Sequence, residues 1–461
     1  METAIKDAKT MFTLGEISEI LGSVMEGDPE SRLTPLMGIE IDGRRTRTGY
    51  LFVAVAGEKR DGHDYVEQAF SNGAAAAVVS REQAARRRWL GSRYIEADDT
   101  VFALGELARS FRRKFDLKVV AVTGSNGKTT VKNLIYEIMS IEGPALKSAM
   151  NFNNFFGLPL SIFKITDSHK AAVFELGMSA AGEISRLSRI ASPDIAVITN
   201  VGPAHLEFFE NVERIADAKL EITDGMRADG ALIINGDDRL LRRKIDRHIE
   251  TVTFGLDGKN DVYPRELEFD DQQRPSFKIN GVKFRMNLPG VHNLYNALAA
   301  IAVAEKLGID TRKYADTLRD YVSTDMRTQI VARAGITYMI DCYNANPVSM
   351  KYALDTLAGM NCAGRRIAVL GDMLELGPRS REYHLETGEY AREKGIDGLF
   401  CCGEFSAGIA RGFGENAIFM NSKSELADRL REFLRSGDLV LFKASRGMAM
   451  EEIVKNLLGS V

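Results

Sequence analysis

Hydrophobic positions along the chain follow two alternating patterns. Short apolar runs, such as residues 119–122, 171–174 and 195–198, are typical of buried parallel strands. The segments between such runs have helical spacing; in residues 131–139 the apolar positions recur at i, i+3, i+4, i+7 and i+8. Because strands and helices alternate over residues 100–323, we expect a parallel sheet there with helices on both faces.

The chain changes character on both sides of this central stretch. Towards the N-terminus, helical patterns and apolar runs mix, at residues 11–21, 51–55, 65–72 and 74–79. Towards the C-terminus the alternation restarts, with apolar runs at residues 338–340, 367–370, 398–401 and 439–442. We therefore expect an α/β protein of three domains: a small mixed N-terminal domain (residues 1–99), a central parallel-sheet domain (100–323) and a C-terminal Rossmann-like domain (324–461).

One segment of the central stretch departs from the parallel pattern. Asn280-Gly281 lies between two short runs, residues 277–279 and 282–284, which is a strong signal for a hairpin. An alanine-rich helical stretch follows and ends near Gly308. The segment predicts an antiparallel appendage on the central domain.

Composition narrows the function classes. The 461 residues are 45% hydrophobic and 27% charged, with a formal net charge of −4, so the charge does not favour a nucleic-acid partner. No apolar run approaches the ~18–20 residues that span a bilayer, and the N-terminus lacks the apolar core of a signal peptide. The cysteines are sparse and form no C-x-x-C pair, which suits a reducing compartment. We expect a cytoplasmic monomer.

The strongest chemical signal is the stretch Thr-Gly-Ser-Asn-Gly-Lys-Thr-Thr at residues 123–130, which joins an apolar run to a helical pattern. Gly124 and Gly127 let the backbone curl so that several amides can point at one anion. The positive end of the helix dipole adds to this attraction. Lys128 can then reach the β- and γ-phosphates of a nucleotide, and the Thr129 hydroxyl can ligate Mg²⁺.

Two polar residues follow predicted strands of the central domain. Glu175 ends the apolar run 171–174, and His205 lies in the loop after the run 195–198. Ligands of open α/β sheets sit beyond the carboxyl ends of the strands, so both residues are expected to face the phosphate loop. A carboxylate in this place can bind Mg²⁺, whereas a single histidine there is by itself only a loop residue.

These features together resemble the Mur ligase family, and the resemblance covers nearly the whole chain. The family's ATP loop, T-G-(S/T)-N-G-K-T, matches residues 123–129, including the non-glycine Val122 before it, where the strict phosphate-loop pattern has glycine. The other matching motifs lie at residues 151–160, 218–221, 290–297, 341–347, 371–377 and 443–448. The motifs at 341–347 and 371–377 are similar to those of the branch that adds D-alanyl-D-alanine.

The resemblance implies an ATP-dependent, ADP-forming ligase that joins a carboxylate to an amine. Its expected substrates are UDP-N-acetylmuramoyl-tripeptide and D-alanyl-D-alanine, and its product is the UDP-muramoyl-pentapeptide precursor of peptidoglycan. The carboxylate would be activated as an acyl phosphate, with ATP and Mg²⁺ bound in the central domain. Phosphoryl transfer of this kind asks mainly for positioning and charge neutralisation.

The resemblance also implies roles for individual residues. Catalysis would rest on Lys128, Glu175, His205 and Lys219, the last as a carbamate, and Mg²⁺ would be held by Thr129, Glu175 and His205. ATP would contact Gly124, Ser125, Asn126, Gly127, Lys128, Thr129, Thr130, Asn293, Arg327 and Asp341. The UDP-sugar tripeptide would contact Asp42, Arg44, Asn151, Asn153 and Asn154, and the dipeptide Asn344, Asn346, Ser445 and Arg446.

The chain departs from the family pattern at two places. The N-terminal motif Asp-Ser-Arg has Gly43 in place of the serine, so a side-chain hydroxyl is missing there. The ribose-side arginine of the family follows a glycine, whereas Arg327 follows Met326.

Three other functions are compatible with a phosphate loop. The family enzyme that adds the third peptide residue reads its amino acid with an Asp-Asn-Pro-Arg motif, which this chain lacks. A folylpolyglutamate synthase would have no place for the N-terminal residues 1–99. A nucleotide-switch GTPase would carry an Asn-Lys-x-Asp motif, which is also missing. Whether the third peptide residue is diaminopimelate or lysine stays open.

Overall fold

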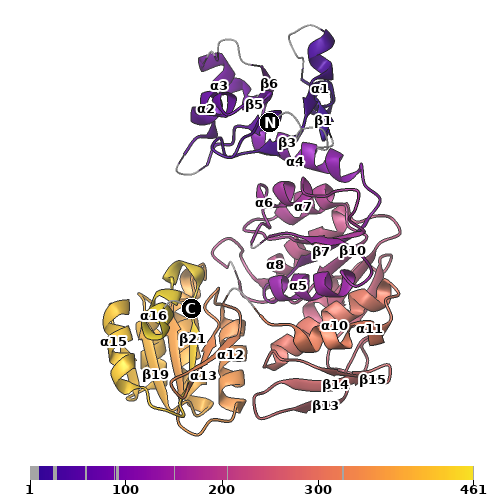
Figure 1. Ribbon diagram of the computed structural model, residues 1–461. Helices are drawn as coiled ribbons and strands as arrows, with labels where there is room; N and C mark the ends of the chain where they lie inside the picture. Colours follow the sequence, from indigo (N-terminus) through magenta and orange to yellow (C-terminus); the bar gives the residue numbers. More distant parts are fainter. Residues whose placement is uncertain are drawn as a thin grey trace.

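The computed structural model describes residues 10–23, 29–57, 60–87, 89, 93–149, 151–204, 206–323 and 326–459. The chain forms three α/β units. The N-terminal unit stands at one end of the central unit, and the C-terminal unit packs beside the central unit (Figure 1). In the described part of the chain, no helix has the length and apolar character needed to cross a membrane.

The N-terminal unit contains a parallel sheet in the order β3-β4-β5-β6. Its elements are β1 (Phe12–Thr13), α1 (Leu14–Leu21), β2 (Pro35–Leu36), β3 (Gly38–Glu40), β4 (Tyr50–Val53), α2 (Val66–Ser71), β5 (Ala76–Ser80), α3 (Arg81–Arg86) and β6 (Tyr94–Ala97). The helix predicted over residues 11–21 starts only at Leu14. Thr13 pairs with Pro35 in the β1–β2 ladder, and its hydroxyl accepts the Glu16 N–H as the helix cap.

The central unit is a six-stranded parallel sheet in the order β12-β11-β10-β7-β9-β8. Its strands are β7 (Lys118–Thr123), β8 (Ala145–Lys147), β9 (Ala171–Glu175), β10 (Ile195–Ile198), β11 (Ala231–Asn235) and β12 (Glu250–Phe254). The apolar runs of β7, β9 and β10 are fully buried, which is why they lack the alternation of a half-exposed strand. Each fully buried Val or Ile there contributes roughly 1.5–3 kcal/mol.

Helices cover both faces of this sheet, as the alternation predicts. α4 (Thr100–Arg112), α6 (Gly157–Ile162) and α7 (Glu183–Ala191) lie on one side, and α5 (Lys128–Met139), α10 (Val291–Lys306) and α11 (Thr311–Asp320) lie on the other (Figure 1). α8 (Val212–Leu220) and α9 (Arg239–Lys244) complete the unit. The predicted hairpin is confirmed: β14 (Pro275–Ile279) pairs antiparallel with β15 (Val282–Arg285) and with β13 (Arg265–Phe269), and Asn280 and Gly281 adopt positive φ in the turn.

The C-terminal unit has a sheet in the order β16-β17-β21-β18-β19-β20, parallel except for β16. Its strands are β16 (Gln329–Arg333), β17 (Ile336–Ile340), β18 (Arg366–Gly371), β19 (Gly398–Cys402), β20 (Ala417–Phe419) and β21 (Leu439–Lys443). Its helices are α12 (Pro347–Gly359), α13 (Ser380–Glu393), α14 (Ser406–Phe413), α15 (Lys423–Phe433) and α16 (Glu451–Leu458). α12, α13 and α14 pack on one face of this sheet, and α15 and α16 pack on the other.

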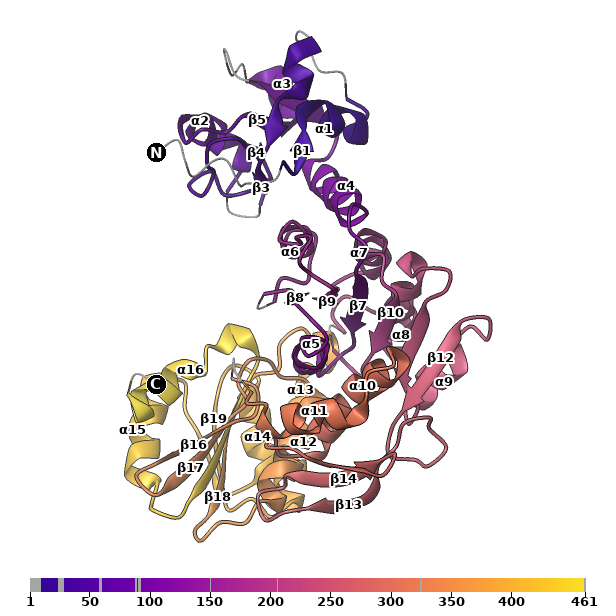
Figure 2. The same ribbon diagram turned by 45° about the vertical axis from the view of Figure 1, so that its right-hand side comes forward.

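α4 connects the N-terminal and central units (Figure 2). It packs against α1 on one side and against α6 and α7 on the other, so the two units share one continuous hydrophobic cluster. The domain limits at residues 99 and 323 stay a prediction.

Candidate active site

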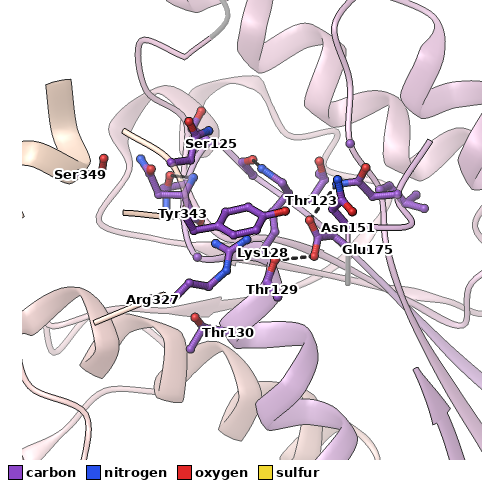
Figure 3. A pocket seen from close by; sticks show the side chains of 18 of the residues that line it. Thr123, Ser125, Lys128, Thr129, Thr130, Asn151, Glu175, Arg327, Tyr343 and Ser349 are labelled. Carbon is purple, nitrogen blue, oxygen red and sulfur yellow. Dashed lines mark hydrogen bonds between the residues drawn. The ribbon is translucent and has the colours of Figure 1, made fainter. Parts of the chain in front are cut away.

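A cavity of about 520 Å³ lies where the carboxyl ends of the central strands face the C-terminal unit (Figure 3). Its central walls include the β7–α5 loop and the ends of β9 and α8. Its other wall comes from the C-terminal unit and includes Arg327, Asp341, Tyr343 and Asn344. The site is therefore built by two domains of the chain.

The loop between β7 and α5 requires its two glycines. Gly124 has φ 147° and Gly127 has φ 81°, in the region that favours glycine. A Cβ at Gly124 would lie 1.9 Å from Thr199 Oγ1, and a Cβ at Gly127 would lie 2.2 Å from Asn296 Oδ1. Both contacts are impossible, so any larger residue would push the loop out of its conformation.

The start of α5 offers backbone donors to the cavity. Its hydrogen-bond ladder begins where the Val131 N–H donates to the Gly127 carbonyl at 2.9 Å. The amides of residues 128–130 precede this ladder at the positive end of the helix dipole, and these residues line the cavity. This arrangement suits a phosphate group.

Lys128 lies at the centre of the cavity wall. Its Nζ donates to the Gly124 carbonyl at 2.7 Å, so the side chain folds back over the loop. Burial lowers the pKa of Lys128; the Glu175 carboxylate opposes this shift and the Arg327 guanidinium adds to it. An anionic ligand would favour the charged form of this lysine.

Glu175 and Thr129 form the part of the site that fits Mg²⁺. The Thr129 hydroxyl donates to Glu175 Oε2 at 2.7 Å (Figure 3), and Asn153 Nδ2 donates to Glu175 Oε1 at 2.9 Å. Burial would raise the pKa of Glu175, but the Lys128, Lys132 and Arg327 cations and the Thr129 hydrogen bond hold it below its usual value. A hydroxyl beside an ionised carboxylate is an oxygen donor set that Mg²⁺ prefers.

The rest of the predicted metal site is only partly described. His205 lies outside the described residues. Within the described ranges, no group of three or more His, Cys, Asp or Glu side chains is placed to hold a metal ion. The assignment of Mg²⁺ to Thr129, Glu175 and His205 therefore stays a prediction.

Lys219 lies near the end of α8 and lines the same cavity. Its side chain is 2% exposed. Burial lowers the pKa of Lys219 well below its usual value, and the positive charge of Lys128 lowers it further. A lower pKa favours the neutral amine, which is the form that reacts with CO₂.

The C-terminal wall presents a cation and a carboxylate. The Arg327 guanidinium stacks on the Tyr343 ring at 3.8 Å from its centroid (Figure 3). Asp341 Oδ1 accepts the Thr328 N–H at 3.0 Å, and Asp341 Oδ2 accepts a hydrogen bond from Lys443 Nζ at 2.7 Å.

Most of the chain matches three domain families. Residues 35–112 match the "Mur ligase family, catalytic domain", residues 122–304 the "Mur ligase middle domain" and residues 326–446 the "Mur ligase, glutamate ligase domain". The UDP-N-acetylmuramoyl-tripeptide--D-alanyl-D-alanine ligase of Bacillus subtilis is 38% identical over 456 residues, which cover 97% of this chain and 98% of the relative. The chain belongs to the Mur ligase family.

Solved Mur ligase structures have the same architecture. A crystal structure of MurF from Acinetobacter baumannii superposes with a TM-score of 0.87 at 28% identity, covering 97% of this chain and 99% of that one. MurF ligase from Thermotoga maritima in complex with ADP gives a TM-score of 0.82 at 31% identity, covering 91% and 96%. The expected α/β fold with three domains is thus confirmed.

Two residues that the Mur ligase resemblance assigned to different ligands contact each other. Asn126 of the phosphate loop was expected to bind ATP, and Asn346 to bind the dipeptide. Asn346 Nδ2 donates to Asn126 Oδ1 at 2.7 Å and Asn126 Nδ2 donates to Asn346 Oδ1 at 3.3 Å, and the ligand roles of both residues stay predictions. This pair joins the central and C-terminal domains.

Other predicted residues split between the cavity and its surroundings. Those that line the cavity are Ser125, Thr130, Asn151, Asn153, Asn154, Asn293 and Asn344. Asn293 is buried, and its side chain donates to the Pro289 carbonyl at 2.8 Å. Ser445 is buried beside the cavity, where its hydroxyl accepts the Leu374 N–H at 2.9 Å. Arg446 forms an ion pair with Glu451 at 2.6 Å and does not line the cavity.

The N-terminal motif of the Mur ligase resemblance lies away from this cavity. Asp42 and Arg44 form an ion pair with each other at 2.8 Å. A Cβ at Gly43 would lie 3.1 Å from Tyr65 Cβ, tighter than normal packing, so a serine there would require Tyr65 to shift slightly. The roles of Asp42 and Arg44 stay predictions.

Sequence reasoning missed Lys132, a buried lysine that lies beside Glu175 of the Mur ligase site. The lysine is 1% exposed; its Nζ donates to the Ser148 carbonyl at 2.9 Å and lies 3.8 Å from Glu175 Oε2. It stands one helical turn after Lys128, so the i, i+4 spacing on α5 was an available signal. His292, Tyr295 and Tyr352 also line the cavity, and only the first two fall in a motif that the sequence identified.

Proposed function

We propose that the chain is an ADP-forming ligase that joins D-alanyl-D-alanine to UDP-N-acetylmuramoyl-tripeptide and so makes the UDP-muramoyl-pentapeptide precursor of peptidoglycan. The observation that carries this proposal is the 38% identity to a ligase of that name over 97% of the chain. A cavity that combines the phosphate loop with residues of the C-terminal domain supports it.

The reaction needs an activated carboxylate, because a free carboxylate does not form an amide at neutral pH. A tripeptide carboxylate oxygen attacks the γ-phosphorus of ATP, the bond to the β-phosphate oxygen breaks, and ADP leaves. The amine of the dipeptide then attacks the acyl carbon of the acyl phosphate. The tetrahedral intermediate collapses, phosphate leaves with the C–O bond electrons, and the nitrogen loses a proton.

The residues of the loop serve the first step. The amides at the start of α5 and the Lys128 ammonium face the place that suits the phosphates, and they offset the charge that moves to the leaving ADP. Mg²⁺, when bound, would supply further charge neutralisation, and Thr129 and Glu175 are the described residues that fit it. His205 is the third predicted ligand. The ADP bound to the Thermotoga maritima relative supports an adenine nucleotide as the ligand of this loop.

Lys219 would act as a carbamate in this scheme. Carbamate formation joins the neutral amine to CO₂ and releases a proton, so it converts a cation to an anion. The burial of Lys219, its lowered pKa and its place in the cavity wall support this role. An anionic group there would be attracted to Lys128 and to Mg²⁺ instead of repelled.

The cysteines bear on the cellular compartment of the protein. The four cysteines are free, which suits the cytoplasm, where thiols stay reduced. We also propose that the chain is a monomer. Light scattering on the purified protein, with and without substrates, tests the monomer.

A phosphate-release assay tests the reaction. UDP-muramoyl dipeptide and tripeptides ending in diaminopimelate or lysine are crossed with D-alanyl-D-alanine, D-alanine, glutamate and diaminopimelate. We expect phosphate only when a tripeptide and D-alanyl-D-alanine are both present. Equal turnover with UDP-muramoyl dipeptide and free diaminopimelate would assign the chain to the branch that adds the third residue. Slow hydrolysis of ATP or GTP alone, unaffected by any acceptor, would indicate a nucleotide switch.

A further inference from the structure

A buried lysine at the end of β21 has no role in the scheme above. The Lys443 side chain is 3% exposed. Its Nζ donates to Asp341 Oδ2 at 2.7 Å, to the Asn344 carbonyl at 3.0 Å and to the Asp341 carbonyl at 3.3 Å. An ammonium carries three donors, and a buried ammonium needs them satisfied. Lys443 is therefore directed at the segment that follows β17.

The Asp341 carboxylate also contacts the turn of residues 326–328, which precedes β16. Its Oδ1 accepts the Thr328 N–H at 3.0 Å. Thr328 has φ 52° and Met326 has φ 57°, a left-handed backbone conformation that residues other than glycine rarely adopt. Such a backbone persists only where its surroundings hold it. The contact with Asp341 holds Thr328, and the Tyr343 N–H holds Met326 by donating to its carbonyl at 3.2 Å.

Arg327 lies between these two strained residues and lines the cavity. Its guanidinium rests on Tyr343, on the side of the cavity that faces Lys128 (Figure 3). Its direction is thus set by a turn whose backbone depends on Asp341, and Asp341 in turn depends on Lys443. The same turn is tied to α10, because Thr328 Oγ1 lies 3.3 Å from His292 Nε2.

We propose that Lys443 is a positioning residue for nucleotide binding: it fixes the Asp341 carboxylate and, through it, the 326–328 turn that presents Arg327 to the cavity. This inference rests on the proposed function only in taking ATP as the ligand of the cavity.

Two other roles for Lys443 make different predictions. A lysine that lines the cavity could contact a phosphate directly, and its loss would then weaken ATP binding whether or not Asp341 is present. A purely structural lysine would change the stability of the C-terminal domain and leave ATP affinity as it was. Positioning through Asp341 instead requires that the effects of the two residues on ATP affinity depend on each other.

The test is a double-mutant cycle on ATP affinity. The variants are Lys443→Met, Asp341→Asn and the double variant, with Lys423→Met as the matched control. Lys423 is a half-buried lysine of the same domain that pairs with Glu452 and donates to the Met448 carbonyl. The dissociation constant of a non-hydrolysable ATP analogue is measured by calorimetry, and thermal unfolding of each variant is recorded beside it.

We expect Lys443→Met to weaken binding about tenfold or more, on the scale of a broken buried charge pair, and Lys423→Met to change it less than about twofold, as for an exposed ion pair. The double variant should bind as Asp341→Asn does. A further tenfold loss in the double variant would overturn the proposal in favour of direct contact. A lowered unfolding temperature with unchanged affinity in Lys443→Met would overturn it in favour of a structural role.

If Lys443→Met does not fold, the double variant still tests the proposal against direct contact with a phosphate. The double variant removes both charges of the pair, and its comparison with Asp341→Asn alone separates positioning from direct contact. Because the binding measurement uses neither acceptor nor dipeptide, its result does not depend on which amide the enzyme makes. If the ligase assay fails but the binding measurements give the expected result, the proposed substrates are wrong and the role of Lys443 is still supported.

Discussion

Asn126 and Asn346, which lie 220 positions apart in the sequence, pair through both side-chain amides. Asn126 is held on its other sides as well, because its N–H donates to Asn200 Oδ1 and its carbonyl accepts the Thr199 hydroxyl. Asn346 caps α12 by accepting the Ser349 N–H. The phosphate loop and the first turn of a C-terminal-domain helix are therefore one hydrogen-bonded assembly.

This pair predicts a coupled effect on catalysis. Asn346→Ser keeps a good helix cap but is too short to reach the loop, and Asn126→Ala removes the other half of the pair. Loss of two hydrogen bonds should lower kcat/KM for ATP roughly five- to thirtyfold in each variant. The kcat/KM of the double variant should be no lower than that of the less active single variant. Steady-state kinetics with unfolding temperatures as control measure this. Effects that multiply in the double variant would show that the two residues act separately.

Lys128 predicts a loss in the chemical step. Its ammonium offsets the charge of the migrating phosphoryl group, so Lys128→Ala should lower kcat by ~10²-fold or more. The fold should persist, because the lysine is only half-buried and its hydrogen bond in the described structure is to the Gly124 carbonyl of its own loop. Rapid-quench measurement of phosphate release gives the rate, and circular dichroism confirms the fold. A variant with near-wild-type kcat would remove Lys128 from the mechanism.

The carbamate on Lys219 predicts chemical rescue. Lys219→Ala should lose most activity, and a short carboxylic acid in the buffer should restore part of it by supplying the missing oxygens. Lys219→Arg should remain inactive with or without the acid, since arginine keeps its charge and does not form a carbamate. Mass spectrometry of the native protein under CO₂ gives an independent readout. Near-full activity of the arginine variant would leave Lys219 as a plain cation.

His292 predicts a stability change at mildly acid pH. Burial lowers its pKa from 6.5 to about 4, with Asp341 opposing the shift and Lys443 adding to it. Between these two values the unfolded chain binds a proton that the folded chain does not, so stability falls as the pH falls from 6.5 towards 4. The loss from this residue is at most about 3 kcal/mol.

Urea unfolding at pH 7 and pH 5 measures this loss. His292→Gln has no group that titrates in this window, so it should lose less stability than the wild type does. His384, whose pKa is also lowered by burial, is present in both proteins and cancels in the comparison. Equal losses in the two proteins would show that His292 takes up its proton in the folded state.

The elements that the sequence predicted well are those with a strong local signal. β7 and β10 are continuous apolar runs because both faces of the central sheet are covered, and the hairpin turn has Asn-Gly in the required backbone region. β16 and β20 were missed. Both are edge strands without a buried residue, and each carries only a short apolar stretch, at residues 330–332 and 417–420.

The features of the site that the sequence predicted are also those with a local signal. The phosphate loop was readable because its chemistry lies in consecutive residues, and the structure places every residue of 124–130 on the cavity wall. The sequence did not predict two other contacts, the pairing of Asn126 with Asn346 and the hydrogen bond from Lys443 to Asp341. Each joins residues that are far apart in the chain, and neither partner has a local pattern that depends on the other.

The position of α4 has a consequence for dissecting the protein. A fragment that starts at residue 100 would expose the face of α4 that packs on α1, and a fragment that starts after Arg112 would uncover α6 and α7. Either cut breaks one hydrophobic cluster whose residues run from Phe12 to Leu241. The ATP-binding core is thus not an autonomous module that could be exchanged between enzymes at that border, and the first two domains should melt in a single cooperative transition.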